Sequence, residues 1–159
     1  MGARHGNYAE THMYLNDISG DGEDVILSSN DMTDCDFTEV EVILYIGCST
    51  AAGYTNSSCR NLLNRSVDEA GCAIAVGFSS TINCSNANEM AELFVKKYFL
   101  SLNCEYEDYE ELTEEESRIA RLACFIEAIN DAACDSGLNS SCVYYTQGVF
   151  YQCTNQVGT

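Results

Sequence analysis

The sequence predicts an α/β protein with a mainly parallel sheet. Two short runs, residues 40–46 and 73–78, are almost entirely apolar, as expected of strands that are covered on both faces. A helical pattern over residues 61–70 lies between them, so the two runs are expected to be adjacent parallel strands in the sheet interior, joined by this helix. The chain has 159 residues, of which 46% are hydrophobic, so it is long enough to form one domain, residues 1–159, with a core of its own.

The first half of the chain is expected to contain short strands and one helix. Residues 25–27 form a short strand, and residues 30–37 form a polar connection to the strand at 40–46. The helix at 61–70 is expected to end at Gly71, because glycine adopts the backbone conformation that closes many helices. Its inner face consists of apolar side chains at helical spacing: Leu62, Leu63, Val67 and Ala70.

The second half is expected to contain two longer helices and a C-terminal hairpin. One capping box opens a helix over residues 86–102, and a second one opens a helix over residues 113–135, which ends before Gly137. Residues 143–152 form a last strand or hairpin with a break at Gly148. The side chains expected to face the core are Met90, Leu93, Phe94 and Tyr98 in the first helix and Ile119, Leu122, Ala123, Ile126, Ile129 and Ala133 in the second.

The charge of the chain excludes several classes of partner. Its 25 acidic and 7 basic residues give a net charge of -18, which is the wrong sign for nucleic acid and for anionic membrane surfaces. No apolar run approaches the ~20 residues that span a bilayer, and residues 1–14 lack the apolar segment of a signal peptide. We therefore expect a cytoplasmic protein without a membrane partner.

Because no C-x-x-C pair is present, a structural zinc site is not expected. No cofactor is expected either.

The ten cysteines leave two alternatives open. Five disulfides in a secreted protein would account for the even number, and four Asn-x-Ser/Thr triplets fit that compartment. Several cysteines instead occupy apolar positions within predicted elements, which favours reduced thiols in the cytoplasm. On this second interpretation, Cys72 and Cys124 are predicted to be buried free thiols.

Cys48 directly follows the strand at 40–46, in a turn of small residues over 47–53. Open α/β sheets place their chemistry at the carboxyl ends of strands, so this thiol is a candidate nucleophile. A buried structural cysteine is the alternative, because a thiol also packs as a small apolar group. Nucleophilic thiol chemistry further needs a base, for which His5 is the candidate.

The chain resembles the caspase-like cysteine peptidases, a group that includes caspases, gingipains, clostripain, separase and the bacterial CHAT domains. The resemblance covers about residues 3–135 and begins with the pair His5-Gly6. It continues with the buried strand that ends in residues 47–51 (GCSTA). In the segment 61–102, a leucine-rich helix ending in Ala-Gly is followed by a strand of the type A-V-I-G and a helix with aromatic residues at helical spacing, as in the CHAT and gingipain branches.

The resemblance implies a three-layer caspase-like sandwich of which this chain is the C-terminal part. In the family, the His-Gly pair follows a central strand that is itself preceded by two β-α units. Here only four residues precede His5, and residues 2–4 do not have the pattern of a strand. We therefore expect an N-terminally truncated version of the fold.

The resemblance also implies a role for each residue of the site. His5 would be the general base and proton donor, Cys48 the nucleophile, and the backbone amides of Gly6 and Cys48 the oxyanion hole. Ser49 and Thr50 would line the substrate cleft. The substrate would be a peptide or protein, cleaved after a basic residue as in clostripain-like and gingipain-like relatives. A second copy of the chain, as a homodimer, or a missing N-terminal segment is the further partner expected.

Three functional classes remain open at this point. The chain is an active or once-active cysteine endopeptidase, a non-catalytic relative that binds a protein partner, or an unrelated acidic α/β protein that is secreted with disulfides. Labelling by a thiol-reactive chloromethyl ketone would distinguish the first class from the second, and a full set of blocked thiols would indicate the third.

Overall fold

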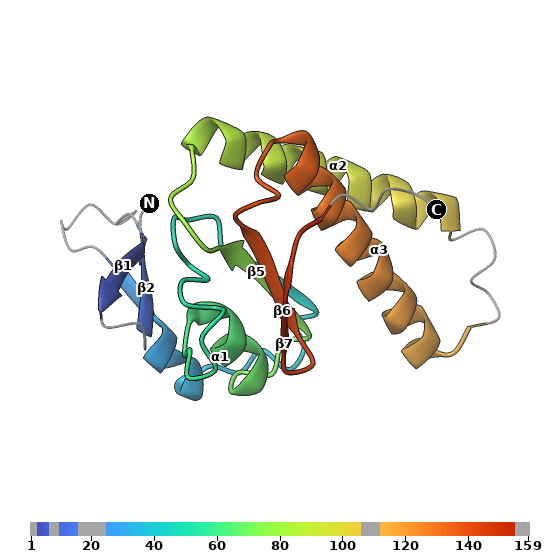
Figure 1. Cartoon of the computed structure of the whole chain (residues 1–159). Coiled ribbons are helices and arrows are strands. Elements are labelled where there is room, and N and C mark those ends of the chain that lie inside the picture. The colour runs from blue at the N-terminus through green and yellow to red at the C-terminus, as the bar shows by residue number, and fades with distance from the viewer. Residues whose placement is uncertain (1–2, 7–9, 16–24, 106–111, 155–159) are drawn as a thin grey trace. The chain divides into compact units, whose positions relative to one another are not determined.

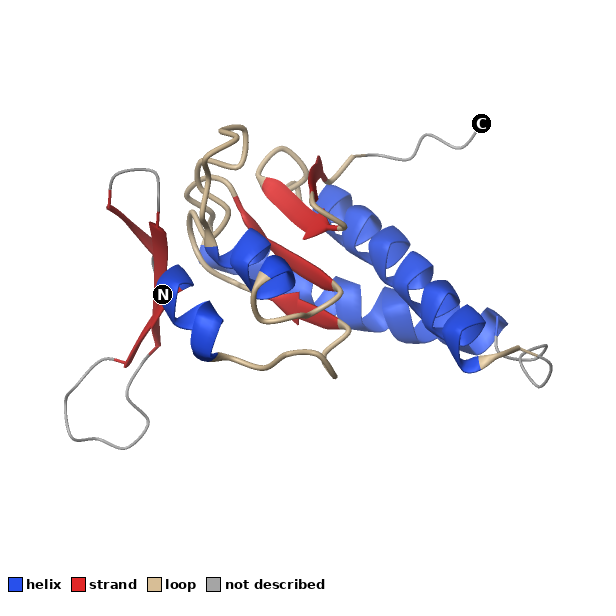
Figure 2. Cartoon of the chain, turned by 90° about the horizontal axis from the view of Figure 1, so that it is seen from below, coloured by secondary structure: helices blue, strands red, loops and turns tan. Residues whose placement is uncertain are grey.

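The computed structural model describes residues 3–6, 10–15, 25–105 and 112–154, and among their side chains those of residues 27–100 and 112–154 (Figure 1). The chain divides into two compact units. The first comprises Met1–Ile82 and Ser141–Gln152, and the second comprises Asn83–Ser140 and Cys153–Thr159. Strands occur in the first unit and the two long helices in the second (Figure 2), so the predicted α/β class is confirmed.

The first unit contains a mixed four-stranded sheet in the order β4-β5-β6-β7. These strands are β4 (Val42–Leu44), β5 (Ile74–Phe78), β6 (Cys142–Thr146) and β7 (Val149–Gln152). β4 and β5 are parallel, and the pairs β5–β6 and β6–β7 are antiparallel. The prediction that the two apolar runs form adjacent parallel strands is therefore confirmed. The predictions that both lie in the sheet interior and that the sheet is mainly parallel are wrong, because β4 is at the edge and one of the three pairings is parallel.

The sheet is mixed because two helices, rather than one, connect β5 to β6. A single crossover helix brings the chain back to the starting edge of a sheet and produces a parallel strand. Two helices in succession return the chain to the edge that it left, and the next strand runs backwards. The register agrees, since Cys142 at the start of β6 pairs with Phe78 at the end of β5.

β4 and β5 differ in how deeply they are buried. All five residues of β5 are buried, as predicted for a strand covered on both faces. The three residues of β4 are only half-buried, so the same prediction is wrong for this strand. The sheet order explains the difference, because among the described strands β4 pairs with β5 alone and lies at the edge.

Helix α1 (Leu62–Asp68) makes the connection between β4 and β5. Asn61 caps its N-terminus, with its side-chain oxygen accepting hydrogen bonds from the backbone of Leu63 and Asn64 at 3.0 and 3.2 Å. Gly71 follows the helix with a φ of 91°, consistent with the predicted end of the helix. The helix contributes to a core cluster of the first unit, which contains Met32, Tyr45, Ala51, Leu62, Leu63, Ala70, Cys72, Ala75, Val143 and Tyr145.

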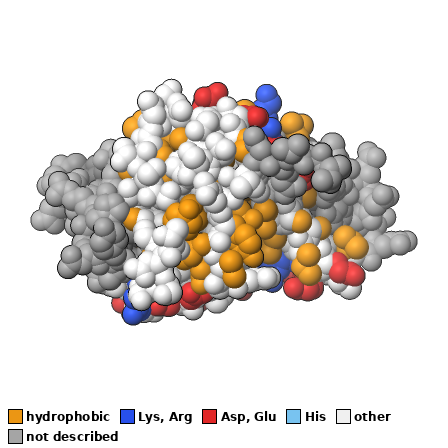
Figure 3. Space-filling view, in the orientation of Figure 1, with side chains coloured by type: hydrophobic (Ala, Val, Ile, Leu, Met, Phe, Trp, Pro, Cys, Tyr) orange, Lys and Arg blue, Asp and Glu red, His pale blue; other side chains and the backbone are white. Residues whose placement is uncertain are grey.

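β6 and β7 form the hairpin predicted for residues 143–152. Gln147 and Gly148 are its two loop residues, and their φ angles are 50° and 80°. Positive φ at both loop positions is the pattern of a type I′ turn, which suits the twist of a hairpin. Hydrophobic side chains are exposed over this hairpin (Figure 3), among them those of Val149 and Tyr151.

The N-terminal part of the first unit forms a second sheet. β1 (Ala3–Gly6), β2 (Glu10–Leu15) and β3 (Val25–Ser28) pair antiparallel in the order β1-β2-β3. The strand expected at residues 25–27 is therefore confirmed, and the expectation that residues 2–4 do not form a strand is wrong from Ala3 onwards. A 3₁₀ helix, η1 (Ser29–Asp34), replaces most of the predicted polar connection, and a capping box of Ser28 and Asp31 starts it.

The second unit is built on helices α2 (Cys84–Glu105) and α3 (Glu114–Asp135). Their aromatic side chains pack together, with Phe125 centred 4.7 Å from the ring of Phe94 and 5.8 Å from that of Tyr98. Lys97 of α2 also pairs with Asp135 of α3, with a distance of 2.9 Å between Nζ and Oδ2.

Each helix of the second unit departs from its prediction in one respect. α2 begins two residues before the predicted capping box, and Asn83 accepts a hydrogen bond from Ser85 N in its first turn. Asn86 instead donates from its side chain to Ser136 O beyond the end of α3. The Thr113–Glu116 capping box of α3 is confirmed, but its buried face is rotated. Ile119 and Ala123 are exposed, and the buried residues are Cys124, Phe125, Ala128, Ile129, Asn130, Ala132 and Ala133.

Candidate functional site

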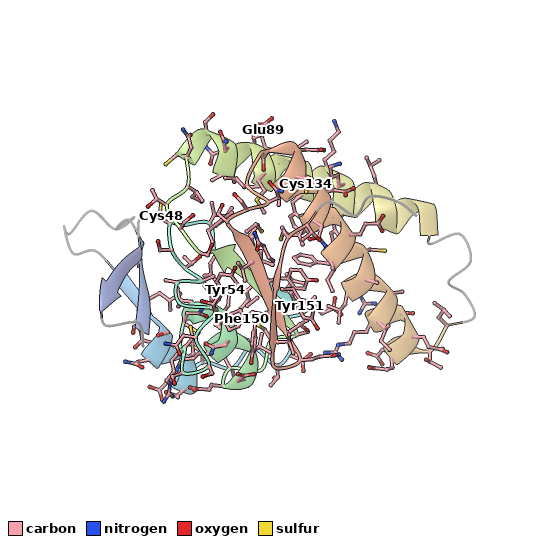
Figure 4. All side chains as sticks on the ribbon, viewed as in Figure 1. Cys48, Tyr54, Glu89, Cys134, Phe150 and Tyr151 are labelled. Atoms are coloured by element: carbon pink, nitrogen blue, oxygen red, sulfur yellow. The ribbon has the colours of Figure 1, made fainter. Side chains whose placement is uncertain are left out.

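Cys48 lies in the loop that follows β4, where the sequence predicted a nucleophile (Figure 4). Pairing with β5 continues past the end of β4, because Tyr45 N donates to Val76 O at 2.9 Å. The cysteine is therefore at the carboxyl end of two parallel strands, which is where α/β sheets place their functional groups. Cys48 is half-buried, so it is neither a core residue nor fully exposed.

The loop is attached to the residues after β5 by backbone hydrogen bonds. Ser49 N donates to Ser80 O at 3.0 Å, and Ala51 N donates to Phe78 O at 2.9 Å. The Thr50 hydroxyl accepts a hydrogen bond from Phe78 N at 2.9 Å. These bonds start from three successive residues directly after Cys48, so the position of the cysteine is defined by the end of β5.

The sulfur of Cys48 contacts both backbone groups of Ile82. Ile82 N is 3.4 Å from Sγ and donates to it, and Ile82 O is 3.6 Å away and can accept from the thiol. An N–H group directed at sulfur stabilises a negative charge there, and the thiolate is the nucleophilic form of cysteine. The local geometry is therefore compatible with nucleophilic chemistry.

Ser49 has a backbone conformation that is uncommon for a residue with a side chain. Its φ is 59°, in the left-handed region, and the residue is 7% exposed. Such a conformation costs of the order of 1 kcal/mol or more and persists only where the surrounding structure enforces it. It turns the chain sharply beside Cys48, which brings residues 49–51 back onto the end of β5.

Thr50 is occupied with holding the loop together. Its side chain is fully buried, and besides accepting from Phe78 N its hydroxyl lies 3.3 Å from Gly47 O. The resemblance implied that Ser49 and Thr50 line a substrate cleft. At 7% and 0% exposure these two side chains are instead part of the interior that supports Cys48.

His5 and Gly6 belong to a different part of the first unit. Both are in β1, where His5 pairs with Thr11 and Gly6 pairs with Glu10 of β2. Their three-stranded sheet has its own hydrogen-bonded order, separate from the sheet that precedes Cys48. The side chain of His5 lies outside the side chains that the structure describes, so the His5–Cys48 pair stays a prediction, as does the oxyanion hole of Gly6 and Cys48.

Ile82 and Ser80 contribute to the surroundings of Cys48 through their backbone and were not predicted. They follow β5, whose carboxyl end lies beside that of β4 because the two strands are parallel. The rule that pointed to Cys48 could therefore have pointed to residues 79–82 as well. No side-chain pattern in these residues indicated a contact, because the groups involved are main-chain atoms.

The described part of the chain contains neither a cluster of metal-ligating side chains nor a membrane-spanning helix. Among those residues, no three His, Cys, Asp or Glu side chains gather into a group able to hold a metal ion. None of the helices described there combines the length and the apolar composition that crossing a membrane requires. The predicted burial of Cys72 and Cys124 is confirmed, at 2% and 3% exposure, and Cys72 forms no disulfide.

The chain was compared with protein-family models, with curated proteins and with solved structures, and none of the three comparisons finds a match.

Proposed function

We propose that the chain is a cysteine peptidase-like hydrolase in which Cys48 is the nucleophile and His5 the general base. The single observation that carries the proposal is the position of Cys48. Cys48 is half-buried at the carboxyl end of two parallel strands, and Ile82 N donates to its sulfur at 3.4 Å. Labelling with an arginyl peptide chloromethyl ketone and cleavage of a fluorogenic arginyl peptide test it.

The proposed reaction follows the chemistry of thiol acyl transfer. The imidazole of His5 accepts the proton of Cys48, and the thiolate attacks the carbonyl carbon of a peptide bond. The backbone amides of Gly6 and Cys48 donate to the developing oxyanion. The imidazole returns its proton to the leaving amine, and water then releases the acyl group from the sulfur. The preferred substrate is a peptide with a basic residue before the scissile bond, because the sequence resembles clostripain and the gingipains.

The proposal predicts selective modification of one cysteine. An arginyl peptide chloromethyl ketone is expected to add once to the full chain, at Cys48. In the proposed site His5 deprotonates this thiol, and the thiolate reacts with the reagent. Intact-protein and peptide mass spectrometry would locate the adduct. Cys84 is the matched control, because it is exposed yet has no proposed role, and Cys84→Ala should leave the labelling unchanged.

The same proposal predicts the loss of turnover with little loss of stability. Cys48→Ala and His5→Ala should each lower cleavage of a fluorogenic arginyl peptide by about 10³-fold or more, since each removes a member of a unit that works together. His12→Ala is the matched histidine control and should retain activity. Melting temperatures should stay within about 3 °C of the wild type, because Cys48 is only half-buried. Labelling that is equal at Cys48 and Cys84, with no turnover, would contradict the proposal.

One observation favours the second candidate, a catalytically inactive relative that binds a protein partner. In the family that the sequence resembles, the histidine follows a strand in the centre of the main sheet. Here His5 is in β1 of a separate antiparallel sheet. This candidate predicts a stable fold in which neither Cys48→Ala nor His5→Ala changes any hydrolytic rate. The labelling experiment with its Cys84 control therefore distinguishes the two candidates.

A further inference from the structure

Two cysteines of the second unit lie on adjoining segments that are far from the Cys48 loop in sequence. Cys134 is in the last turn of α3, and Cys153 directly follows β7 (Figure 4 labels Cys134). Thr154 N donates to the side-chain oxygen of Asn130 at 3.2 Å, which attaches the segment after β7 to α3. Asn130 and Cys134 are four residues apart and therefore share one face of the helix. This hydrogen bond thus brings Cys153 to the face of α3 that carries Cys134.

The burial of Cys153 indicates the direction of its side chain. Cys153 is 1% exposed, whereas its neighbours Gln152 and Thr154 are exposed, so among these three residues the cysteine alone is directed inward. Cys134 is half-buried. Burial raises the pKa of the Cys134 thiol, and the next cause is the proximity of Cys153, followed by Asp131 and Asp135.

We propose that Cys134 and Cys153 form a reversible disulfide that fastens the segment after β7 to the end of α3. The backbone at Cys134 is well defined for this purpose. Gly137 N donates to Cys134 O at 3.0 Å, and Leu138 N donates to Ala133 O at 2.7 Å. With Gly137 at a φ of 72°, these bonds form a Schellman motif that closes the helix directly after the cysteine.

The oxidant is a small disulfide, and the exchange is balanced. The thiolate of Cys134, the more accessible of the two, attacks one sulfur of the small disulfide and releases one thiolate. The thiolate of Cys153 then attacks the Cys134 sulfur of this mixed disulfide and releases the second small thiolate. The two protein thiols lose two electrons and two protons, and the small disulfide is reduced to two thiols.

Disulfide mapping tests the proposal on the full chain. The protein is treated with cystamine, its remaining thiols are blocked, and it is digested with Asp-N and chymotrypsin. Cleavage before Asp131 and Asp135 and after Tyr151 separates Cys134, on residues 131–134, from Cys153, on residues 152–159. We expect these two peptides to be found linked after oxidation, and separate after treatment with a reductant.

The stability of the oxidised chain gives a second measurement. The disulfide closes the loop between Cys134 and Cys153, which lowers the conformational entropy of the unfolded chain. The melting temperature should therefore rise by about 5–10 °C relative to the reduced chain. Cys134→Ser should abolish the rise, whereas the matched control Cys84→Ser, which removes an exposed cysteine, should retain it.

Two results would overturn the proposal. One is oxidation that stops at a cystamine adduct on Cys134. The other is Cys153 linked to a different cysteine, such as Cys142 on the neighbouring chymotryptic peptides. Cys153→Ser is a weaker test because it alters a buried position, so the mapping and Cys134→Ser decide the outcome.

Discussion

Thr50 shows how a residue expected to contact substrate supports the site from within. Its hydroxyl accepts from Phe78 N at the end of β5, and its side chain is fully buried. The backbone N–H of Phe78 therefore has a hydrogen-bond partner only while the loop that carries Cys48 and Thr50 stays in this position. The loop and β5 are joined at this point by a side chain rather than by sheet pairing alone.

Gly77 is the counterpart of Thr50 in β5. A Cβ added to Gly77 would meet the hydroxyl oxygen of Thr50 and would lie 2.7 Å from Leu63 Cδ1. Glycine within a strand marks a close approach of other groups, and here those groups are the Cys48 loop and α1.

We predict that Gly77→Ala lowers the free energy of unfolding by about 2–3 kcal/mol, because the loop and α1 must move away from β5. Urea denaturation measures this change. Thr50→Ala is also destabilising, since it leaves Phe78 N without its partner. The double variant should cost less than the two single changes added together, because removing the Thr50 hydroxyl makes room for the new methyl group. Strictly additive costs would show that the two residues do not meet.

Cys48 could be predicted from the sequence, and its contacts could not. An apolar strand followed by small residues places the cysteine at the carboxyl end of that strand, where α/β proteins generally carry their functional groups. The contacts of its sulfur are with the main chain of Ile82, which any amino acid would provide. The left-handed conformation of Ser49 also has no signal, because serine is not a residue that usually marks positive φ.

Local sequence patterns predicted which helices and strands form better than they predicted which face of a helix is buried. The β4-α1-β5 unit and the Thr113 capping box depend on short stretches of sequence and were predicted correctly. The buried face of α3 was not, because apolar residues surround much of this helix. Its orientation follows from the packing of Phe125 against Phe94 and Tyr98 of α2, a contact between distant residues.

The β6–β7 hairpin contains a turn whose sequence is not optimal for its shape. Gln147 has a φ of 50°, yet asparagine tolerates this conformation better and is favoured before glycine in type I′ turns. We predict that Gln147→Asn raises the free energy of unfolding by about 0.5–1 kcal/mol. Gln147→Val should lower it by about 1 kcal/mol, because a β-branched side chain is strained at positive φ.

Chemical denaturation of both variants would measure these changes. Gln152→Asn is the matched control, since it makes the same exchange within β7, and it should be neutral or slightly destabilising. A stabilising Gln152→Asn, or a Gln147→Val without cost, would contradict the type I′ turn.

For the whole molecule, the class of fold was predictable but the topology of the sheet was not. Alternating apolar runs and helical patterns indicate an α/β protein whatever the order of the strands. Whether β6 runs parallel or antiparallel to β5 depends on two helices acting together as one connection. That is a property of residues 84–135 taken as a whole, and no single motif within them carries it.

Buried acidic hydroxyl and thiol groups should make the fold sensitive to alkali. Burial raises the pKa of Tyr45 to about 12, and that of Cys72 to about 12. Burial, together with a 2.8 Å hydrogen bond to Asp68, also raises the pKa of Tyr145 to about 12. In the unfolded chain these groups return to ordinary values, about 8.5 for cysteine and 10 for tyrosine. All three are protonated in both states at neutral pH, so their contribution is fully present there.

We therefore predict that stability falls as the pH rises from about 9 to 12. In this range the unfolded chain releases protons that the folded chain retains, and each such group removes about 1.4 kcal/mol per pH unit. Cys72 acts first, above about pH 9, together with Cys59 and Cys134, whose thiol pKa values burial also raises, and the two tyrosines follow above about pH 10. Free energies of unfolding measured in urea between pH 8 and 10.5 should be level at first and then decline with increasing slope.

Variants assign this slope to individual groups. Tyr45→Phe should reduce the decline above pH 10, and at neutral pH it should cost about 1 kcal/mol for the lost hydrogen bond to Ser66, whose donor and acceptor oxygens are 2.6 Å apart. Cys72→Ala should make the decline shallower from its start, because the unfolded chain then releases one proton fewer relative to the folded chain. Tyr151→Phe is the matched control, since this tyrosine is exposed, and it should leave the profile unchanged. A profile that is flat up to pH 10.5, or one that Tyr151→Phe alters as much as Tyr45→Phe, would show that the buried groups do not govern alkaline stability.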